Sequence, residues 1–193
     1  MQTGKSTRSL ILSGLIIMVF IGILFFIFSG PVSSLLGESI NSLRSALHGL
    51  SAGIFMVTMT IGFYQAFRLW QGIPVGNPKE LGIGAVINTI ACFFTIVFGN
   101  WLYIPYRAQG GPRSFFVENM PPVHKVFFEF KEFTALFTFP LVVAATYIIL
   151  VYADHLNTNK KLREMVSLLL GFAFFFFIIA FALGAAITKL KSV

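Results

Sequence analysis

The sequence predicts an all-α integral membrane protein, a bundle of about five transmembrane helices. Of its 193 residues, 56% are hydrophobic and 11% are charged, whereas about a quarter of the residues in soluble proteins are charged. The apolar residues come in runs of roughly 20, the length that a helix needs to cross a bilayer core. Lys and Arg are scattered singly between these runs, so the net charge of +7 indicates contact with a membrane surface and not with nucleic acid.

The first apolar run follows Lys5 and Arg8 and therefore has the charged head and apolar body of a signal peptide. Its body is long and rich in Phe, and no small-x-small cleavage site follows, so we expect it to be retained as a span. Gly30 and Pro31 are expected to end it. We interpret the chain, 1–193, as a single transmembrane domain with spans at about 9–29, 48–66, 82–104, 122–152 and 165–188.

The fourth span is the longest of the five. Pro121 and Pro122 suit the first turn of its helix. The helical pattern then continues for about 30 residues, or roughly 45 Å, which exceeds the hydrocarbon thickness. We therefore expect a long amphipathic extension at the start of this helix, and a bend at Pro140 in mid-span.

The orientation of the chain is weakly encoded, because Lys and Arg divide equally between the two membrane faces. Lys125 and Lys131 belong to the fourth helix and not to a loop, and the first span often dominates insertion. We therefore expect a cytoplasmic amino terminus.

Two histidines suggest a cofactor. His48 begins the second span and His124 begins the fourth, and these spans run in the same direction, so both histidines lie near one membrane face. Two imidazoles from neighbouring helices can ligate a haem iron from its two sides. The sequence thus predicts haem b near one face, with His48 and His124 as axial ligands. The competing interpretation is that each histidine is interfacial or hydrogen-bonds another helix.

Four further residues complete the predicted haem site. Gly49 and Gly53 are four residues apart beside His48, so they share a helix face that a flat cofactor can approach. Arg107 and Arg113, in the longest connection, are the expected partners of the haem propionates.

The segment 121–132 is unusually charged for a membrane helix. Glu129 and Glu132 are candidate proton-handling groups, quinone-site acids, or metal ligands together with His124. Alternatively, they form salt bridges with Lys125 and Lys131 on an extension outside the membrane. Helical spacing predicts two adjacent faces: one with Lys125, Glu129 and Glu132, and one with His124, Phe128 and Lys131.

Our first functional hypothesis is a haem-binding electron-transfer subunit. A second is a structural helical subunit of a larger membrane complex, and a third is a proton or ion conductor that uses Glu129 and Glu132. The sequence contains no Gly-x-x-x-x-Gly-Lys phosphate loop and no His-Glu-x-x-His zinc helix. We therefore expect a subunit of a redox complex more than a stand-alone enzyme.

A resemblance favours the first hypothesis. The run 100–107, followed by His124, Glu129, Lys131 and Glu132, resembles a loose pattern in bacterial membrane proteins linked with electron-transport genes. The architecture is also similar to that of small membrane b-type cytochromes. We expect a place in a bacterial inner (cytoplasmic) membrane. The electron-transfer hypothesis implies other membrane or redox subunits, and a quinone, as partners.

Overall fold

The computed structural model describes residues 3–74 and 77–191, with side chains from residue 12 onward except at 78 and 79. This part of the chain is helical and contains no strand, which confirms the all-α prediction. Five of its helices are long and apolar enough to cross a membrane. The elements are α1 (Thr3–Leu36), α2 (Ile40–Trp70), α3 (Pro78–Arg107), α4 (Pro112–Asn119), η1 (Val123–Phe128), α5 (Glu129–Tyr152), η2 (Ala153–His155) and α6 (Lys160–Leu190).

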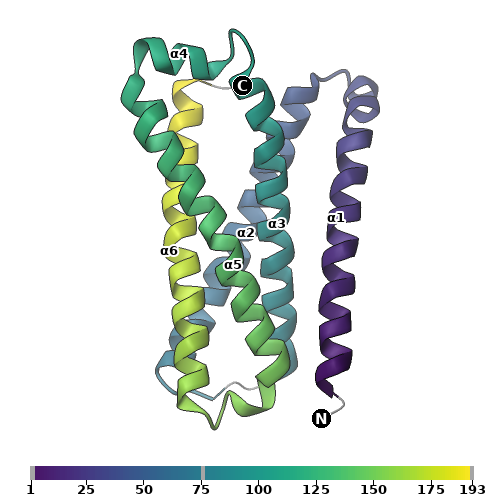
Figure 1. Ribbon diagram of the computed structural model, residues 1–193, viewed down its shortest axis with the longest axis vertical. Coiled ribbons are helices and arrows are strands. Elements are labelled where there is room, and N and C mark those ends of the chain that lie inside the picture. The colour runs from purple at the N-terminus through teal and green to yellow at the C-terminus, as the bar shows by residue number, and fades with distance from the viewer. Residues whose placement is uncertain (1–2, 75–76, 192–193) are drawn as a thin grey trace.

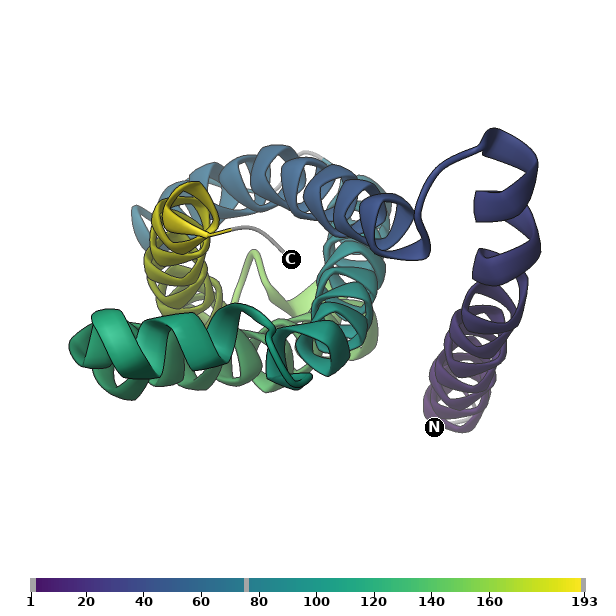
Figure 2. The ribbon, with the colours of Figure 1, turned by 90° about the horizontal axis from the view of Figure 1, so that it is seen from above.

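Four of the long helices, α2, α3, α5 and α6, form a closed ring when the molecule is seen from above (Figure 2). Helix α1 stands beside this ring, and the short helix α4 lies across one end of it, near the carboxyl terminus (Figure 1). We call this end the α4 end. Helices α2 and α5 both begin there, which confirms that the second and fourth spans run in the same direction.

The ends of the helices differ from those that the apolar runs alone indicate. Helix α1 does not end at Gly30 and Pro31 but continues to Leu36, with Pro31 inside it. Proline is tolerated within membrane helices because neighbouring groups satisfy the freed carbonyl. The chain turns at Gly37, whose φ of 67° suits glycine, and the Ser39 side chain caps α2 by accepting a hydrogen bond from the Ser42 amide.

The core of the bundle is apolar and draws on all four helices of the ring. Phe55 of α2 and Phe177 of α6 lie with their ring centroids 4.4 Å apart. Met59, Val142 and Ile149 have no exposed surface. Small buried residues throughout the same core allow the helix backbones to approach closely, as is usual in membrane bundles.

The extension expected at the start of the fourth span is present, but it is not a plain α-helix. Its first six residues form a π-helical turn, η1, which leads directly into α5. The long connection before it contains α4, which begins at Pro112 after a sharp turn at Gly110. The expected site residues therefore lie around the α4 end.

Candidate functional site

The π-helical turn sets the direction of the side chains at the start of α5. Such turns are rare and often occur at functional sites. His124 and Phe128 are buried against the bundle, with 6% and 7% of their surfaces exposed, whereas Lys125 and Glu129 are exposed. The separation into two faces is thus confirmed for these four residues.

Aromatic rings of α3 receive His124 and Phe128. The Tyr106 hydroxyl and the His124 Nδ1 atom form a hydrogen bond of 3.0 Å. The Tyr106 and Phe128 rings are stacked, with centroids 4.2 Å apart and an interplanar angle of 2°. Tyr103 stacks on the same pair, at 5.8 Å from each ring. The stack fixes η1 against the end of α3.

Further into the bundle lie two more ionisable side chains, each packed on a glycine of a neighbouring helix. His48 of α2 packs on Gly99 of α3, where an added Cβ would lie 3.1 Å from the histidine Cε1 atom. Lys131 of α5 packs on Gly184 of α6, where an added Cβ would lie 3.4 Å from the lysine Cε atom. The Lys131 ammonium is near enough to His48 for their charges to interact. We call these four residues the His48–Lys131 layer.

The ionisable groups around this layer lack salt bridges. Within the described residues, one ion pair is formed. It joins the Lys160 Nζ atom to the Glu164 Oε1 atom at 3.6 Å and lies far from the layer. The Lys131 Nζ atom lies 5.2 Å from the centroid of the Phe128 ring. The Glu132 carboxylate is within hydrogen-bonding reach of the Tyr103 hydroxyl. The salt bridges expected between the glutamates and lysines of this segment are therefore absent from the described structure.

His48 is held in one orientation by its backbone partner. Its Nδ1 atom lies 3.0 Å from the carbonyl oxygen of Thr95. Because a carbonyl only accepts hydrogen bonds, Nδ1 carries the proton, and a neutral His48 then has an unprotonated Nε2. This nitrogen is available to accept a proton or to ligate a metal.

The two histidines contact different levels of α3. His48 packs on Gly99 and His124 bonds to Tyr106, and seven residues of helix span roughly 10 Å. Tyr103 lies between these levels and stacks on Tyr106 and Phe128. Axial ligation of one iron requires the two ring nitrogens to be about 4 Å apart, twice a typical metal–nitrogen bond. Haem ligation by this pair stays a prediction.

The other predicted haem contacts lie away from the layer. Gly49 and Gly53 are on an exposed face of α2, and an added Cβ at either position meets no heavy atom within 4 Å. The room beside His48 is instead provided by Gly99. Arg107 and Arg113 are exposed at the α4 end, where the Arg107 guanidinium carbon lies 4.3 Å from the centroid of the Tyr103 ring.

The described residues contain no group of three or more His, Cys, Asp or Glu side chains that could hold a metal ion. His124 is buried whereas Glu129 is exposed, so the two do not converge. The metal site considered for His124 with Glu129 and Glu132 is therefore not formed by the described structure.

The letters Gly-x-Ser-x-Gly, which mark the nucleophile elbow of many serine hydrolases, occur at 49–53. In those enzymes the serine lies on a sharp turn between a strand and a helix. Here Ser51 lies within α2 and its hydroxyl donates to the His48 carbonyl oxygen at 2.9 Å. The local structure does not support a hydrolase.

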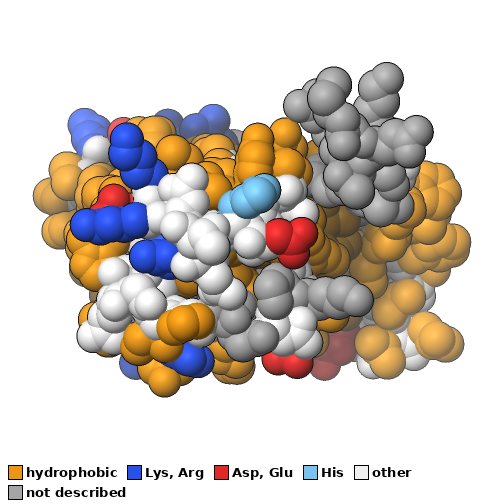
Figure 3. Space-filling model, turned by 90° about the horizontal axis from the view of Figure 1, so that it is seen from below, with side chains coloured by type: hydrophobic (Ala, Val, Ile, Leu, Met, Phe, Trp, Pro, Cys, Tyr) orange, Lys and Arg blue, Asp and Glu red, His pale blue; other side chains and the backbone are white. Residues whose placement is uncertain are grey.

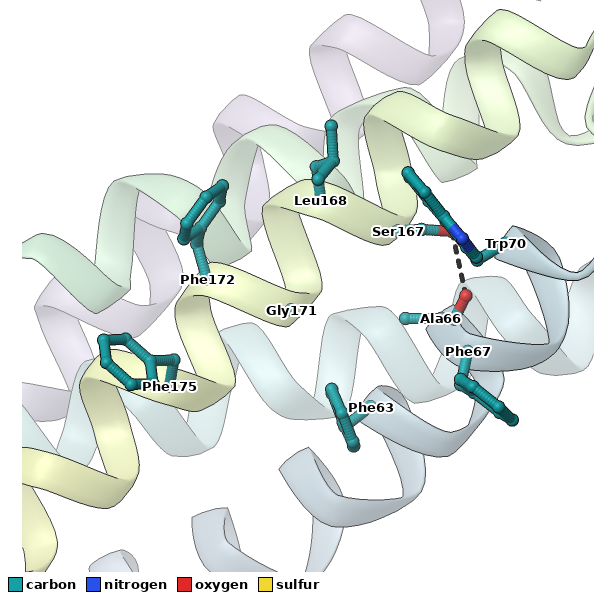
Figure 4. A pocket seen from close by; sticks show the side chains of 9 residues that line it. All are labelled: Phe63, Ala66, Phe67, Trp70, Ser167, Leu168, Gly171, Phe172 and Phe175. Atoms are coloured by element: carbon teal, nitrogen blue, oxygen red, sulfur yellow. Dashed lines mark hydrogen bonds between the residues drawn. The ribbon is translucent and has the colours of Figure 1, made fainter.

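An apolar groove lies elsewhere. It has a volume of about 420 Å³ and runs between α2 and α6 toward the end opposite α4, among aromatic side chains such as Phe63, Trp70 and Phe172 (Figure 4). The hydroxyl of Ser167 there donates to the Ala66 carbonyl oxygen at 2.8 Å. The groove is almost wholly apolar and offers little for chemistry.

Charges at the opposite end are solvated or have partners. Lys and Arg side chains gather on one side of that face beside scattered acidic groups (Figure 3). Arg163 donates to the carbonyl oxygens of Leu156 and Asn157 there. The interior groups at the α4 end thus differ in kind from the surface charges of the other end.

Comparison with models of protein families, with curated proteins and with solved structures finds no match to this chain. The candidate site is therefore defined by its own geometry. Its central residues include Lys131, Gly99 and Gly184, none of which we predicted as site residues. For Lys131 a signal existed, because its spacing placed it on the same face as His124 and Phe128.

Proposed function

We propose that this chain conducts protons, and that Glu132, Lys131 and His48 carry them from the α4 end into the bundle. The observation that supports the proposal is the His48–Lys131 layer, in which two ionisable groups, each packed on a glycine, lie inside a membrane bundle without a salt bridge in the described structure. Such groups are costly in a membrane, and they are common members of proton relays. The proposal modifies our third hypothesis, because Glu129 is exposed and Lys131 replaces it.

The chemistry needs only proton transfers. Glu132, half-buried beside the Tyr103 hydroxyl, can take up a proton at the membrane surface. The Lys131 amine can carry a proton toward the imidazole of His48. His48 can accept it at Nε2 while its Nδ1–H stays on the Thr95 carbonyl oxygen. Each step moves one proton between an oxygen or nitrogen atom and the next, directly or through water.

The proposed path covers the half of the bundle at the α4 end. Beyond the layer, Phe55, Met59 and Cys92 are almost completely buried in the apolar core. Passage to the opposite face therefore requires water to enter between these side chains, by movement of the helices.

Flux measurements on reconstituted vesicles test the proposal. A pH-sensitive dye inside the vesicles reports proton entry under an imposed potential. We expect Lys131→Met to lower the flux by about a hundredfold, the usual contribution of a positioned proton-transfer group. Lys125→Met is the matched control, because Lys125 lies on the same segment but is exposed. Flux no greater than in protein-free vesicles, or equal flux in the two variants, would contradict the proposal.

Haem binding and electron transfer form a second candidate function, which one observation favours. Both histidines hydrogen-bond through Nδ1, to Thr95 and to Tyr106. Axial ligands usually make such a bond with the nitrogen that does not face the metal. In this function, His48 and His124 would hold haem b, and redox subunits and a quinone would be the partners.

The absorption spectrum of the purified protein tests this second candidate. We expect the Soret and α bands of a low-spin b-type haem, lost in His48→Ala and in His124→Ala. His155→Ala is the control, because the third histidine is exposed at the opposite end. A folded but colourless preparation would exclude haem binding.

A further inference from the structure

The seam between α1 and the ring contains a groove that faces the membrane. Helix α1 meets α3 through aromatic pairs such as Phe26 with Trp101, whose ring centroids are 5.4 Å apart. On the α2 side, a groove of about 370 Å³ remains open. Six α1 side chains between Ile21 and Val32 line it, together with Leu43 and Leu47 of α2.

An unpaired cation lies at the same seam. Arg44 is between the two groove-lining leucines in sequence, and its guanidinium carbon lies 5.2 Å from the centroid of the Phe26 ring. Its Nε atom is buried and has no hydrogen-bond partner. The nearby Glu38 carboxylate accepts a hydrogen bond from Ser42, and no ion pair joins it to Arg44 in the described structure. The half-buried Arg44 guanidinium thus lacks an anionic partner in the described structure.

The dimensions of the seam match those of a lipid. From Val32 to Ile21, α1 rises by about 16 Å, close to half of the roughly 30 Å hydrocarbon core, which is the length of one acyl chain. Arg44 lies four residues after the start of α2, and its guanidinium lies against Phe26, between the two ends of the groove. The seam therefore combines an apolar groove as long as one acyl chain with a single cation beside it.

We propose that this seam binds a phospholipid with an anionic headgroup, its acyl chain along α1 and its phosphate oxygens on Arg44. The planar guanidinium matches the phosphate geometry. A zwitterionic headgroup carries its own cation and so competes with Arg44, whereas an anionic headgroup does not. The site is independent of the proposed proton path.

Native mass spectrometry of the full chain in detergent tests the proposal, with phosphatidylglycerol and phosphatidylcholine of identical acyl chains as probes. We expect preferential retention of phosphatidylglycerol, and a loss of about tenfold in its retention in Arg44→Gln, the value of one charge-assisted contact. Arg107→Gln is the matched control, an exposed arginine at the same end. Leu47→Trp, which fills the groove, should lower the retention of both lipids.

Several results would overturn the lipid site. Equal retention of the two lipids would show that the headgroup charge is not recognised. Unchanged retention in both Arg44→Gln and Leu47→Trp would place bound lipid elsewhere. If Arg44→Gln does not fold, lipid retention in Leu47→Trp alone tests whether the lipid lies in the groove. A lipid-free dimer of the chain that Leu47→Trp dissociates would show that a second copy fills the seam.

Discussion

The two halves of the four-helix ring treat polar groups in opposite ways. In the half away from α4, the buried polar groups are neutral. Thr146 donates to the Ala85 carbonyl oxygen at 3.0 Å and lies 2.8 Å from the Thr89 hydroxyl, whereas the buried Asn88 Oδ1 atom has no hydrogen-bond partner. In the α4-end half, His48 and Lys131 are ionisable and lack salt bridges. The first arrangement joins helices, and the second carries an energetic cost of the kind that is common at functional sites.

The largest effect on stability is expected in the apolar half. Ile149 has no exposed surface, so Ile149→Ala should lower the free energy of unfolding by about 2–5 kcal/mol through lost contacts and a cavity. Denaturation in mixed detergent micelles measures it. Proton flux should be unchanged once the protein is folded. A loss of flux without a loss of stability would remove the distinction between the halves.

An intermediate effect of opposite sign is expected in the α4-end half. Lys131→Met removes an unpaired ammonium from the membrane and keeps most of the packing on Gly184, so it should raise the free energy of unfolding by about 1–3 kcal/mol. The same denaturation assay reports it, with Lys125→Met expected within about 0.5 kcal/mol of the wild type. Destabilisation by Lys131→Met would instead make the lysine a structural residue.

The smallest effect is expected at the satisfied hydroxyls. Thr146→Val keeps the shape of the side chain but removes its hydrogen bond to Ala85, which should cost about 1 kcal/mol, as for other hydrogen bonds between membrane helices. Thr60→Val is the comparison, because the exposed Thr60 hydroxyl bonds only within its own helix. If the two changes have equal effects, the contact between α3 and α5 does not depend on this bond.

Apolar run length predicted the fold, because four of the expected spans each lie within one long helix and the span 122–152 is divided between η1 and α5. The helix ends were predicted less well. The expected 48–66 corresponds to α2, Ile40–Trp70, since helices continue past the hydrocarbon core into the headgroup region. The stop expected at Pro31 was wrong, because a membrane helix can contain proline.

The candidate site was predicted in part. The parallel direction of two spans placed His48 and His124 correctly at one end. Their partners could not be predicted, because contact between His48 and Gly99 depends on the rotation of α2 and on the register between helices. Neither appears in the pattern of apolar residues. A salt bridge of the glutamates with Lys131 was one of the alternatives for the same segment, and the described structure does not contain it.

The π-helical turn Val123–Phe128 has a consequence for how this protein can change during evolution. A π turn accommodates one residue more than an α turn, and one residue corresponds to about 100° of helix rotation. Loss of the exposed Val126 would convert the turn to a regular helix and swing His124 away from Tyr106, while Lys131 stayed in place. A single codon deletion would thus separate the outer histidine from the inner lysine without rebuilding the helix that carries both.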